Sequence, residues 1–291
     1  MPEIGNKIAN RDINLVDETF DASQSGSCHL YIQIETGGLS FCVFNTVINK
    51  FIVLRNYLFH ETNPHAWVDE CSSIFANDDL LGLQYKSSGL LWISPRSTLV
   101  PDNLFDPNEA DAYLSFNHGE LANERTQHNY IKSAGLYNVF SCPESLINLL
   151  RNYQPKIRLF HQTTTLIESV ITGIASLDKF MAIYFYSRNL EFVIVENKKL
   201  LFNNSFQINA PEDSVYFLAG VSNLFNIELL STHLLYVGDM KRLPPEVAIL
   251  EDYVERFIEC EPPNAVTYSY LIAEPLRKNF INLFNLFGCE S

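Results

Sequence analysis

Residues 28–59 read CHLYIQIETGGLSFCVFNTVINKFIVLRNYLF and contain the strongest indication of the fold. It contains three apolar runs of strand length, rich in the β-branched and aromatic residues that favour strands. Thr36-Gly37-Gly38 separates the first two runs, and glycines between such runs indicate a hairpin. We expect both glycines to adopt positive φ, because a two-residue turn between twisted strands requires it. The predicted strands are residues 29–35, 39–45 and 50–59.

The same order of elements returns after residue 160. Three strand-like runs again follow one another, separated by short polar turns. In each half the third run is followed by a helix that begins at a proline, Pro64 and Pro211, and proline suits a first helical turn. The repeated order indicates an internal structural duplication, visible in the pattern rather than in residue identity. The second set of strands is predicted at residues 180–186, 190–196 and 199–208.

The chain divides near residue 160 into two predicted domains that mix strands and helices, so the fold class is α/β. Residues 1–27 are polar and are interpreted as an N-terminal arm. The first domain covers residues 28–160, with extra material at 82–154, and the second covers residues 161–291. The second domain is predicted to end with a helix at 245–258, a strand at 265–272 and a helix at 275–287.

The 291-residue chain is acidic, with 34 acidic and 20 basic side chains and a formal net charge of −14. The excess of acidic residues is the same in both halves. Residues 1–160 include 18 acidic and 11 basic side chains and residues 161–291 include 16 acidic and 9 basic ones, so each half has a net charge of −7. Nucleic-acid binders gather Lys and Arg along a phosphate track. We therefore expect no binding to DNA or RNA.

Targeting signals are not apparent in the sequence. The first residues lack a basic stretch followed by an apolar core, which predicts no signal peptide. No apolar run approaches the roughly 20 residues of a membrane-spanning helix, so we expect a cytoplasmic protein. The cysteines are widely spaced without a C-x-x-C pair, which predicts buried thiols rather than disulfides or zinc ligands. They are Cys28, Cys42, Cys71, Cys142, Cys260 and Cys289.

Short motifs of known enzymes are weak or absent. Residues 60–65 resemble the zinc-protease H-E-x-x-H, but they have one residue too many and Pro64 breaks the helix. Residues 176–179 match S-x-x-K without its companion motifs. No phosphate-binding loop, dinucleotide fingerprint or hydrolase elbow occurs. Asp78 and Asp79 follow the first helix, where a solvated turn is a simpler interpretation than a nuclease metal site.

Three antiparallel strands, a crossover helix and further parallel strands make the ribonuclease H-like unit, and two such units in tandem make the actin-like ATPase fold. The pattern over about residues 28–288 resembles this fold. The chain looks like a member of an uncharacterised bacterial family of unknown function. It is also similar to the actin-like assembly proteins of type IV pili and type II secretion. The resemblance implies two tandem ribonuclease H-like domains with a cleft between them.

Working actin-like ATPases hold nucleotide with a hairpin turn in each domain. An Asp ends the first strand of that hairpin and a Gly follows one residue later, so that backbone amides meet phosphates. In the first domain Glu35 replaces the Asp, and Gly37, Gly38 and Ser40 follow it. The second-domain turn, residues 185–190, has neither an acid nor a glycine. The resemblance therefore implies that the second phosphate turn is lost.

The adenine-contacting element of the same fold is an apolar strand that ends in Gly-Gly. Residues 234–237 followed by Gly238 and Asp239 match it, with Asp in place of the second Gly. We expect a degenerate actin-like scaffold or protein-interaction module, without efficient ATP hydrolysis, cofactor or metal. Its protein partner and oligomeric state are not identified by the sequence. The alternative is a nucleotide-binding ATPase that holds Mg-ATP in the interdomain cleft through Glu35, Gly37, Gly38, Ser40, Gly238 and Asp239.

Arg188 lies in the second-domain turn, where an ATPase has a small or acidic residue. We expect its guanidinium to pair with Glu35 or Asp239 across the cleft and to act as a structural joint. The alternative is that Arg188 binds an anionic ligand, because a guanidinium can donate two parallel hydrogen bonds to a carboxylate or phosphate.

Overall fold

The computed structural model of the chain describes residues 10–60, 64–120, 122–173 and 178–289. Two of the short motifs considered above, at 60–65 and 176–179, lie partly outside these residues. The chain forms two units, each described here by itself. The first comprises residues 1–130, 136–162 and 265–273, and the second comprises residues 131–135, 163–264 and 274–291.

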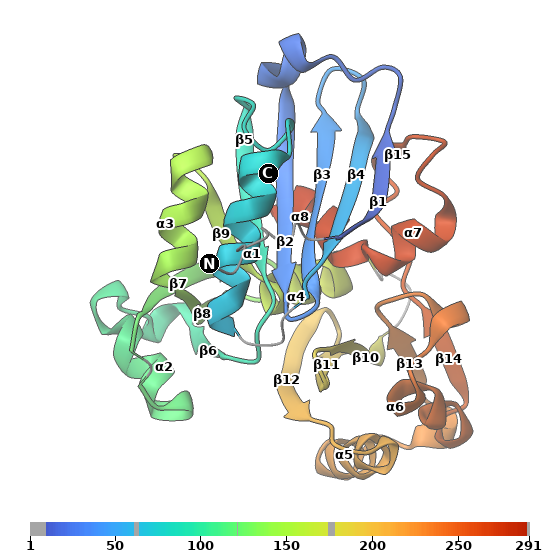
Figure 1. Ribbon diagram of the computed structural model, residues 1–291. Helices are drawn as coiled ribbons and strands as arrows, with labels where there is room; N and C mark the ends of the chain where they lie inside the picture. Colours follow the sequence, from blue (N-terminus) through green and yellow to red (C-terminus); the bar gives the residue numbers. More distant parts are fainter. Residues whose placement is uncertain (1–9, 61–63, 121, 174–177, 290–291) are drawn as a thin grey trace, which may run out of the picture. The chain divides into compact units, whose positions relative to one another are not determined.

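The first three predicted strands form an antiparallel meander, which confirms the sequence-based prediction (Figure 1). The middle strand β3 pairs with β2 on one side and with β4 on the other. Every residue of β3 is buried, so both faces of the sheet are covered at its centre. The strands are β2 (Cys28–Glu35), β3 (Gly38–Asn45) and β4 (Lys50–Leu58).

Further strands extend this sheet to the order β1-β4-β3-β2-β5-β9. Two of them run parallel to β2 on its far side, as a ribonuclease H-like unit requires. On the other edge, the segment interpreted as an N-terminal arm supplies β1, which pairs antiparallel with β4. The added strands are β1 (Asn10–Val16), β5 (Ser87–Trp92), β9 (Arg158–His161) and the short β15 (Thr267–Tyr268), which pairs with β4.

Helices α1 (Pro64–Asn77) and α3 (Glu144–Tyr153) cover one face of the sheet (Figure 1). Their apolar side chains, such as Ile74 and Ile147, pack in one core with Ile32 of β2. The extra material predicted between residues 82 and 154 adds a three-stranded sheet of order β6-β8-β7 with one helix. These elements are β6 (Ser97–Pro101), α2 (Ala110–His118), β7 (Glu124–Ile131) and β8 (Leu136–Pro143).

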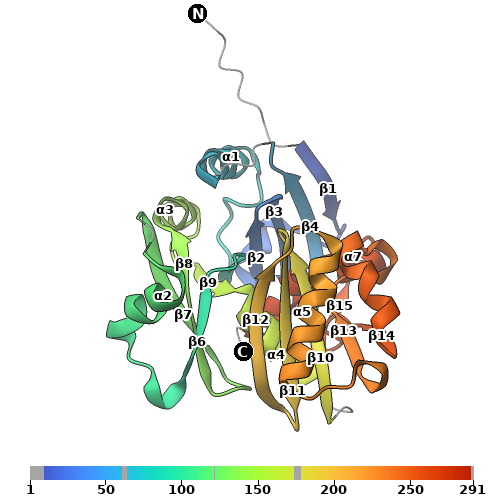
Figure 2. The same cartoon turned by 90° about the horizontal axis from the view of Figure 1, so that it is seen from below.

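The second unit repeats the meander at the start of a five-stranded sheet of order β12-β11-β10-β13-β14. Figure 2 shows α5 lying across the face of β10, β11 and β12. Its residues Leu218 and Val221 join the core formed with Phe192 and Ile194 of β11. The elements are α4 (Gln162–Gly173), β10 (Lys179–Tyr186), β11 (Asn189–Glu196), β12 (Lys199–Gln207), α5 (Pro211–Leu224) and β13 (His233–Tyr236).

The end of the chain differs from the prediction. The predicted helix at 245–258 stops after one turn and is followed by a 3-10 helix and a strand, β14, parallel to β13. The predicted strand at 265–272 contributes only β15. Pro262 and Pro263, which cannot donate to a sheet, follow β14 closely and end its pairing. The elements are α6 (Pro245–Ala248), β14 (Arg256–Glu259), α7 (Glu274–Asn279) and α8 (Ile281–Cys289).

All six cysteines are free thiols, and four of them are buried, which confirms the expectation of buried thiols for those four. The other two, Cys260 and Cys289, are partly exposed. Among the described residues, no helix is both long enough and apolar enough to span a membrane.

The glycines of the first hairpin do not have the predicted positive φ, so that prediction is wrong. Gly38 is needed for space instead, because a Cβ atom built on it would lie 2.1 Å from the carbonyl oxygen of Tyr57 on β4. A Cβ atom on Gly37 would meet nothing within 4 Å. Positive φ occurs instead in the second-unit hairpins, at Ser187 (44°), Arg188 (62°), Asn197 (52°) and Lys198 (62°).

Substitution of the two glycines should therefore have unequal effects. Gly38→Ala should lower the free energy of unfolding by about 2–3 kcal/mol, because β4 must move to admit the new methyl group. Gly37→Ala should change it by less than about 0.5 kcal/mol, as is usual at an open surface site. Urea unfolding of both variants measures the difference. Equal losses in the two variants would contradict the close approach of Gly38 to β4.

Candidate functional site

The first-unit turn joins Glu35 of β2 to Gly38 of β3, and these residues are the last pair of the hairpin. The carboxylate of Glu35 is partly buried and accepts a hydrogen bond from Nε2 of Gln33 at 3.1 Å. Burial raises the pKa of Glu35, so this acid holds its proton more readily than a solvated glutamate.

Ser40 lies two residues after the turn, on β3, and is buried. Its hydroxyl donates a hydrogen bond to Oδ1 of Asn56 on β4 at 2.7 Å. The proton of this hydroxyl is therefore already used in holding two strands together. Of the two glycines predicted at this turn, only Gly37 has no atom within 4 Å of its Cβ position.

The second predicted pair, Gly238 and Asp239, directly follows β13. Gly238 has φ of 155°, and a Cβ atom on it would lie 2.7–2.9 Å from ring atoms of Tyr236. The Tyr236 side chain thus lies against Gly238 where a Cβ atom would be. Asp239 is buried and caps a short 3-10 helix, because its carboxylate accepts from the backbone N–H of Lys241 at 3.0 Å. Gly238 leaves room for the Tyr236 side chain, and Asp239 stabilises the start of the 3-10 helix.

The second-unit turn holds Ser187 and Arg188 in the left-handed region, at a conformational cost that glycine would avoid. The guanidinium of Arg188 donates to two carbonyl oxygens of the same unit, those of Ile208 at 3.3 Å and Asn209 at 2.9 Å. The ion pair with Glu35 or Asp239 stays a prediction, and both of these hydrogen bonds lie within the second unit. Arg188 fastens its own hairpin to the segment that leads into α5.

A buried acid that the sequence analysis missed lies beyond this turn. Glu191 on β11 is 1% exposed, and its Oε1 accepts from the Thr163 hydroxyl at 2.7 Å and from Asn203 Nδ2 at 2.9 Å. The available signal was a single charge inside the apolar run LEFVIV. Its side chain thus links β11 to α4 and to β12.

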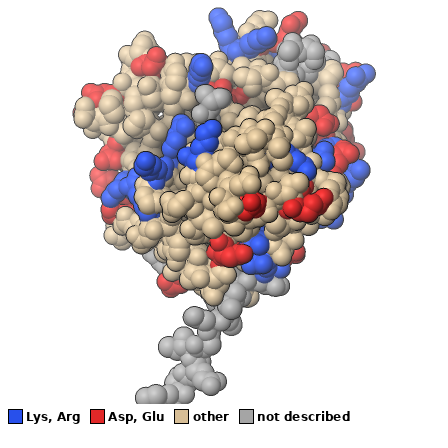
Figure 3. All heavy atoms as spheres, turned by 90° about the horizontal axis from the view of Figure 1, so that it is seen from above, with Lys and Arg blue, Asp and Glu red and all other residues tan. Residues whose placement is uncertain are grey.

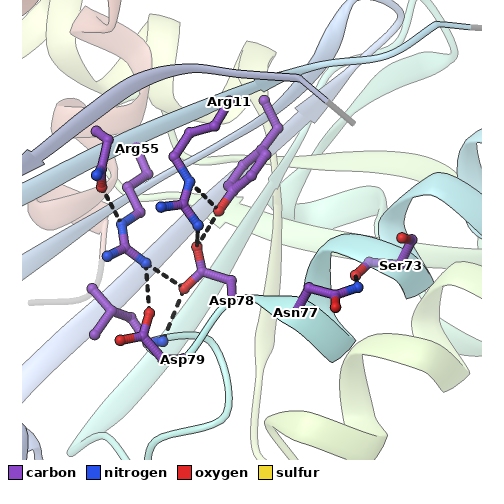
Figure 4. A network of polar contacts seen from close by, with 9 residues as sticks. Arg11, Arg55, Ser73, Asn77, Asp78 and Asp79 are labelled. Carbon is purple, nitrogen blue, oxygen red and sulfur yellow. Dashed lines mark hydrogen bonds and ion pairs between the residues drawn. The ribbon is translucent and has the colours of Figure 1, made fainter. Parts of the chain in front are cut away.

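A second missed group is an ion network in the first unit (Figure 4). Asp78 is buried, and Nη1 of Arg55 donates to Asp78 at 2.6 Å and to Asp79 at 2.9 Å. The hydroxyl of Tyr57 also donates to Asp78, and Nε of Arg11 donates to Tyr57 at 2.8 Å. The interpretation of Asp78 as part of a solvated turn is therefore wrong.

This ion network joins β1, β4 and the loop after α1. Burial and the neighbouring Asp78 raise the pKa of Tyr57 to about 12, so its hydroxyl stays protonated and donates. Arginine side chains bond both carboxylates, which leaves the pair poorly suited to a metal ion. In the described part of the chain, no group of three or more His, Cys, Asp or Glu side chains is placed to hold a metal.

The second unit contains a cavity of about 360 Å³ between α4, β13, β14 and α8. Its charged lining residues are Glu259 and Glu261, with no Lys or Arg. Glu259 is already engaged, because it accepts from the Met240 N–H at 2.7 Å and forms an ion pair with Lys278. An apolar cavity bordered by carboxylates does not suit a phosphate group.

The start of α4 carries a buried polar cluster in the first unit. His161 is fully buried, its Nε2 donates to the Ser94 carbonyl oxygen at 2.9 Å, and its Nδ1 accepts from Asn138 Nδ2 at 3.3 Å. Gln162 also donates to the Ser94 carbonyl oxygen, at 2.8 Å. Burial lowers the pKa of His161 to about 3, so the ring is neutral and serves as a fixed connector.

These features accompany a clear family assignment. Residues 17–257 match the family model DUF3822, described as a protein of unknown function. The chain belongs to this family. A search of the curated proteins finds no match to the sequence.

Solved structures agree with the assigned fold. A Bacteroides thetaiotaomicron protein with an actin-like ATPase fold and unknown function has a TM-score of 0.81 at 22% identity, over 93% of this chain and 99% of its own. The PilM-PilN type IV pilus biogenesis complex has a TM-score of 0.59 at 12% identity, and the match covers 90% of this chain and 99% of the other. The cytoplasmic domain of EpsL, from the type II secretion system of Vibrio cholerae, has a TM-score of only 0.45 at 11% identity. The match covers 91% of this chain and 96% of the other. The chain therefore has the actin-like ATPase fold of two ribonuclease H-like units, which confirms the predicted fold class.

His161 gives a prediction about pH. Its pKa of about 3 in the folded protein lies below the value near 6.5 of an unfolded chain, so its contribution to stability is complete above pH 6.5 and is lost as the pH falls. At pH 5 the loss should be about 2 kcal/mol. Urea unfolding at pH 7 and pH 5 should show a smaller fall in His161→Gln than in the wild type. His128→Gln, at an exposed histidine, is the control that keeps the wild-type fall. An unchanged fall in His161→Gln would show that another group causes the acid destabilisation.

Proposed function

We propose that this protein is a degenerate actin-like scaffold that binds another protein and does not hydrolyse ATP efficiently. The observation that carries the proposal is the hairpin at Ser187 and Arg188. A phosphate approaches backbone amides most easily at glycines, and this turn has two side chains and no acid to orient a metal ion. Arg188 is bonded to the carbonyl oxygens of Ile208 and Asn209 rather than open toward a ligand.

The remaining predicted nucleotide residues support the same proposal. Ser40 is bonded to Asn56, the ring of Tyr236 lies against Gly238, and Asp239 caps a 3-10 helix. Each of these contacts would have to break or move to admit a nucleotide. Glu35 is the exception, since its only described side-chain partner is the neutral amide of Gln33. The alternative function, a nucleotide-binding ATPase with Mg-ATP as cofactor, depends chiefly on this residue and on Gly37.

A protein partner fits the fold better than a nucleic acid. The pilus relative is described as a complex of PilM with PilN, so a protein with this fold can serve as one member of an assembly. On the face drawn in Figure 3, acidic and basic side chains both occur, in places side by side, and uncharged areas lie between these groups. With a net charge of −14, this surface gives little attraction to phosphate. We place the protein in the cytoplasm, with a partner that is not yet identified.

Thermal unfolding with and without Mg-ATP tests the proposal. We expect the same melting temperature in about 1 mM Mg-ATP as in Mg²⁺ alone. A ligand at 100 times its Kd would add about 2.7 kcal/mol of stability, and the melting temperature would rise by at least about 5 °C. Such a rise would overturn the proposal.

Arg188→Ala is the matched variant. It should lower the free energy of unfolding by about 1 kcal/mol, because two hydrogen bonds to backbone carbonyls are lost. Its response to Mg-ATP should equal that of the wild type. A nucleotide-induced rise that is present in the wild type and lost in Arg188→Ala would assign the nucleotide to this turn and support the ATPase alternative.

A further inference from the structure

The outer edge of the second-unit sheet differs from its counterpart in the first unit. β4 and β12 are the third strands of the two repeated meanders. In the first unit, β1 pairs antiparallel with the outer edge of β4, from Asn10 opposite Leu58 to Val16 opposite Val53. In the second unit, as far as the described residues extend, β12 lies at the edge of the sheet and pairs with β11. The outer edge of the third strand is therefore paired with β1 in the first unit. In the described part of the second unit, the corresponding edge of β12 has no further strand beside it.

The composition of β12 is unusual for an edge strand. Edge strands normally carry charges, prolines or short lengths that prevent association with other chains. β12 is nine residues long with the sequence KLLFNNSFQ, and its one charge is at the first position, Lys199. A register shift opposite Ile194 and Val195 separates that position from the regular part, residues 202–207. The regular part is FNNSFQ, which contains no charge and no proline.

The pairing of β12 with β11 shows which backbone groups point outward. Tyr186 and Asn189 close the β10–β11 hairpin as a hydrogen-bonded pair, and bonding alternates along β11 from there. Leu190, Phe192 and Ile194 therefore bond to β12, and their partners are Phe206, Asn204 and Phe202.

The intervening residues Asn203 and Ser205 direct their N–H and C=O groups away from the sheet. The N–H of Ser205 donates only to the side-chain Oδ1 of the adjacent Asn204, at 2.9 Å, in agreement with this direction. A second strand would replace that local bond with one to its own backbone carbonyl.

The exposed edge is complementary to itself. Phe202-Asn203-Asn204-Ser205-Phe206 has the same character read in either direction from Asn204. In an antiparallel pair of two such strands with Asn204 at the two-fold axis, Asn203 faces Ser205 of the second copy. Those are the two residues whose backbone groups point outward, so they would form the hydrogen-bonded pairs. Phe202 would then lie opposite Phe206 of the second copy.

The helix above this strand adds apolar surface. Phe225 packs on Phe202 with ring centroids 5.1 Å apart, and Phe217 stacks on Phe206 at 4.4 Å, so α5 runs along β12. The neighbouring residues Tyr216 and Leu224 are 74% and 69% exposed. A two-fold axis normal to the sheet would place both α5 helices on one face, where these side chains could be buried.

We propose that β12 is a self-association edge at which two copies of this chain form one continuous ten-stranded sheet. The uncharged strand gives two molecules of net charge −14 a place to approach without direct repulsion. The contact is isologous, with Asn204 at its centre, and it does not depend on whether the protein binds nucleotide. The partner at this edge is therefore a second copy of the chain.

Sedimentation velocity over about 1–100 µM tests the proposal, and the wild type should sediment as a dimer of twice 33.3 kDa. Asn204→Lys and Asn204→Glu each place like charges opposite each other at the axis, and each should weaken the dimer at least about fivefold. An equimolar mixture of the two variants should restore dimers, because opposite charges then face each other. Gln84→Lys, at an exposed first-unit residue, is the charge-matched control and should remain dimeric.

Restoration in the mixture also shows that both variants are folded. A wild type that is monomeric over the whole range would overturn the proposal and leave the edge to an extended segment of another protein. A dimer that Asn204→Lys does not weaken, or a mixture that stays monomeric, would overturn it equally.

Discussion

Burial of the middle strand on both faces is the constraint on which the rest of each unit depends. β3 is buried along its whole length, and β11 is buried except at its two ends. A strand of this kind needs a strand on either side and side chains packed above and below. The meander supplies the strands in both units, and helices such as α1 and α5 supply the packing. In the first unit the strands approach so closely that only glycine fits at position 38.

The two units share the three-stranded meander but differ in their turns, sheet edges and buried charged residues. The first has a glycine-containing turn, an added strand β1 and a buried ion network that fastens the loop after α1. The second has a turn of residues other than glycine in the left-handed region, a buried Glu191 and, among the residues that the structure describes, an edge strand β12 paired on one side. Ser40, Asp239 and Arg188 form hydrogen bonds that stabilise strands and turns within their own units.

Much of the fold could be predicted from local patterns, because alternating apolar runs and glycine or polar turns specify strands without long-range information. The contacts of Asp78 could not, since its partner Arg55 lies 23 residues earlier on another element. The use of Gly38 was misjudged for a similar reason: the requirement comes from the Tyr57 carbonyl on a third strand rather than from the turn itself. The strand at 256–259 was hidden inside a helical pattern, because pairing with β13 outweighed local preference.

Ser40, Asp239 and Arg188 are held by hydrogen bonds within their own units, and we infer that no nucleotide displaces these contacts. Hydrogen–deuterium exchange of the two hairpin turns, residues 35–40 and 186–190, with and without about 1 mM Mg-ATP tests it most directly, because it examines the backbone amides that would contact phosphate. We expect identical exchange at both turns with and without Mg-ATP. Slower exchange at either turn when Mg-ATP is present would contradict it.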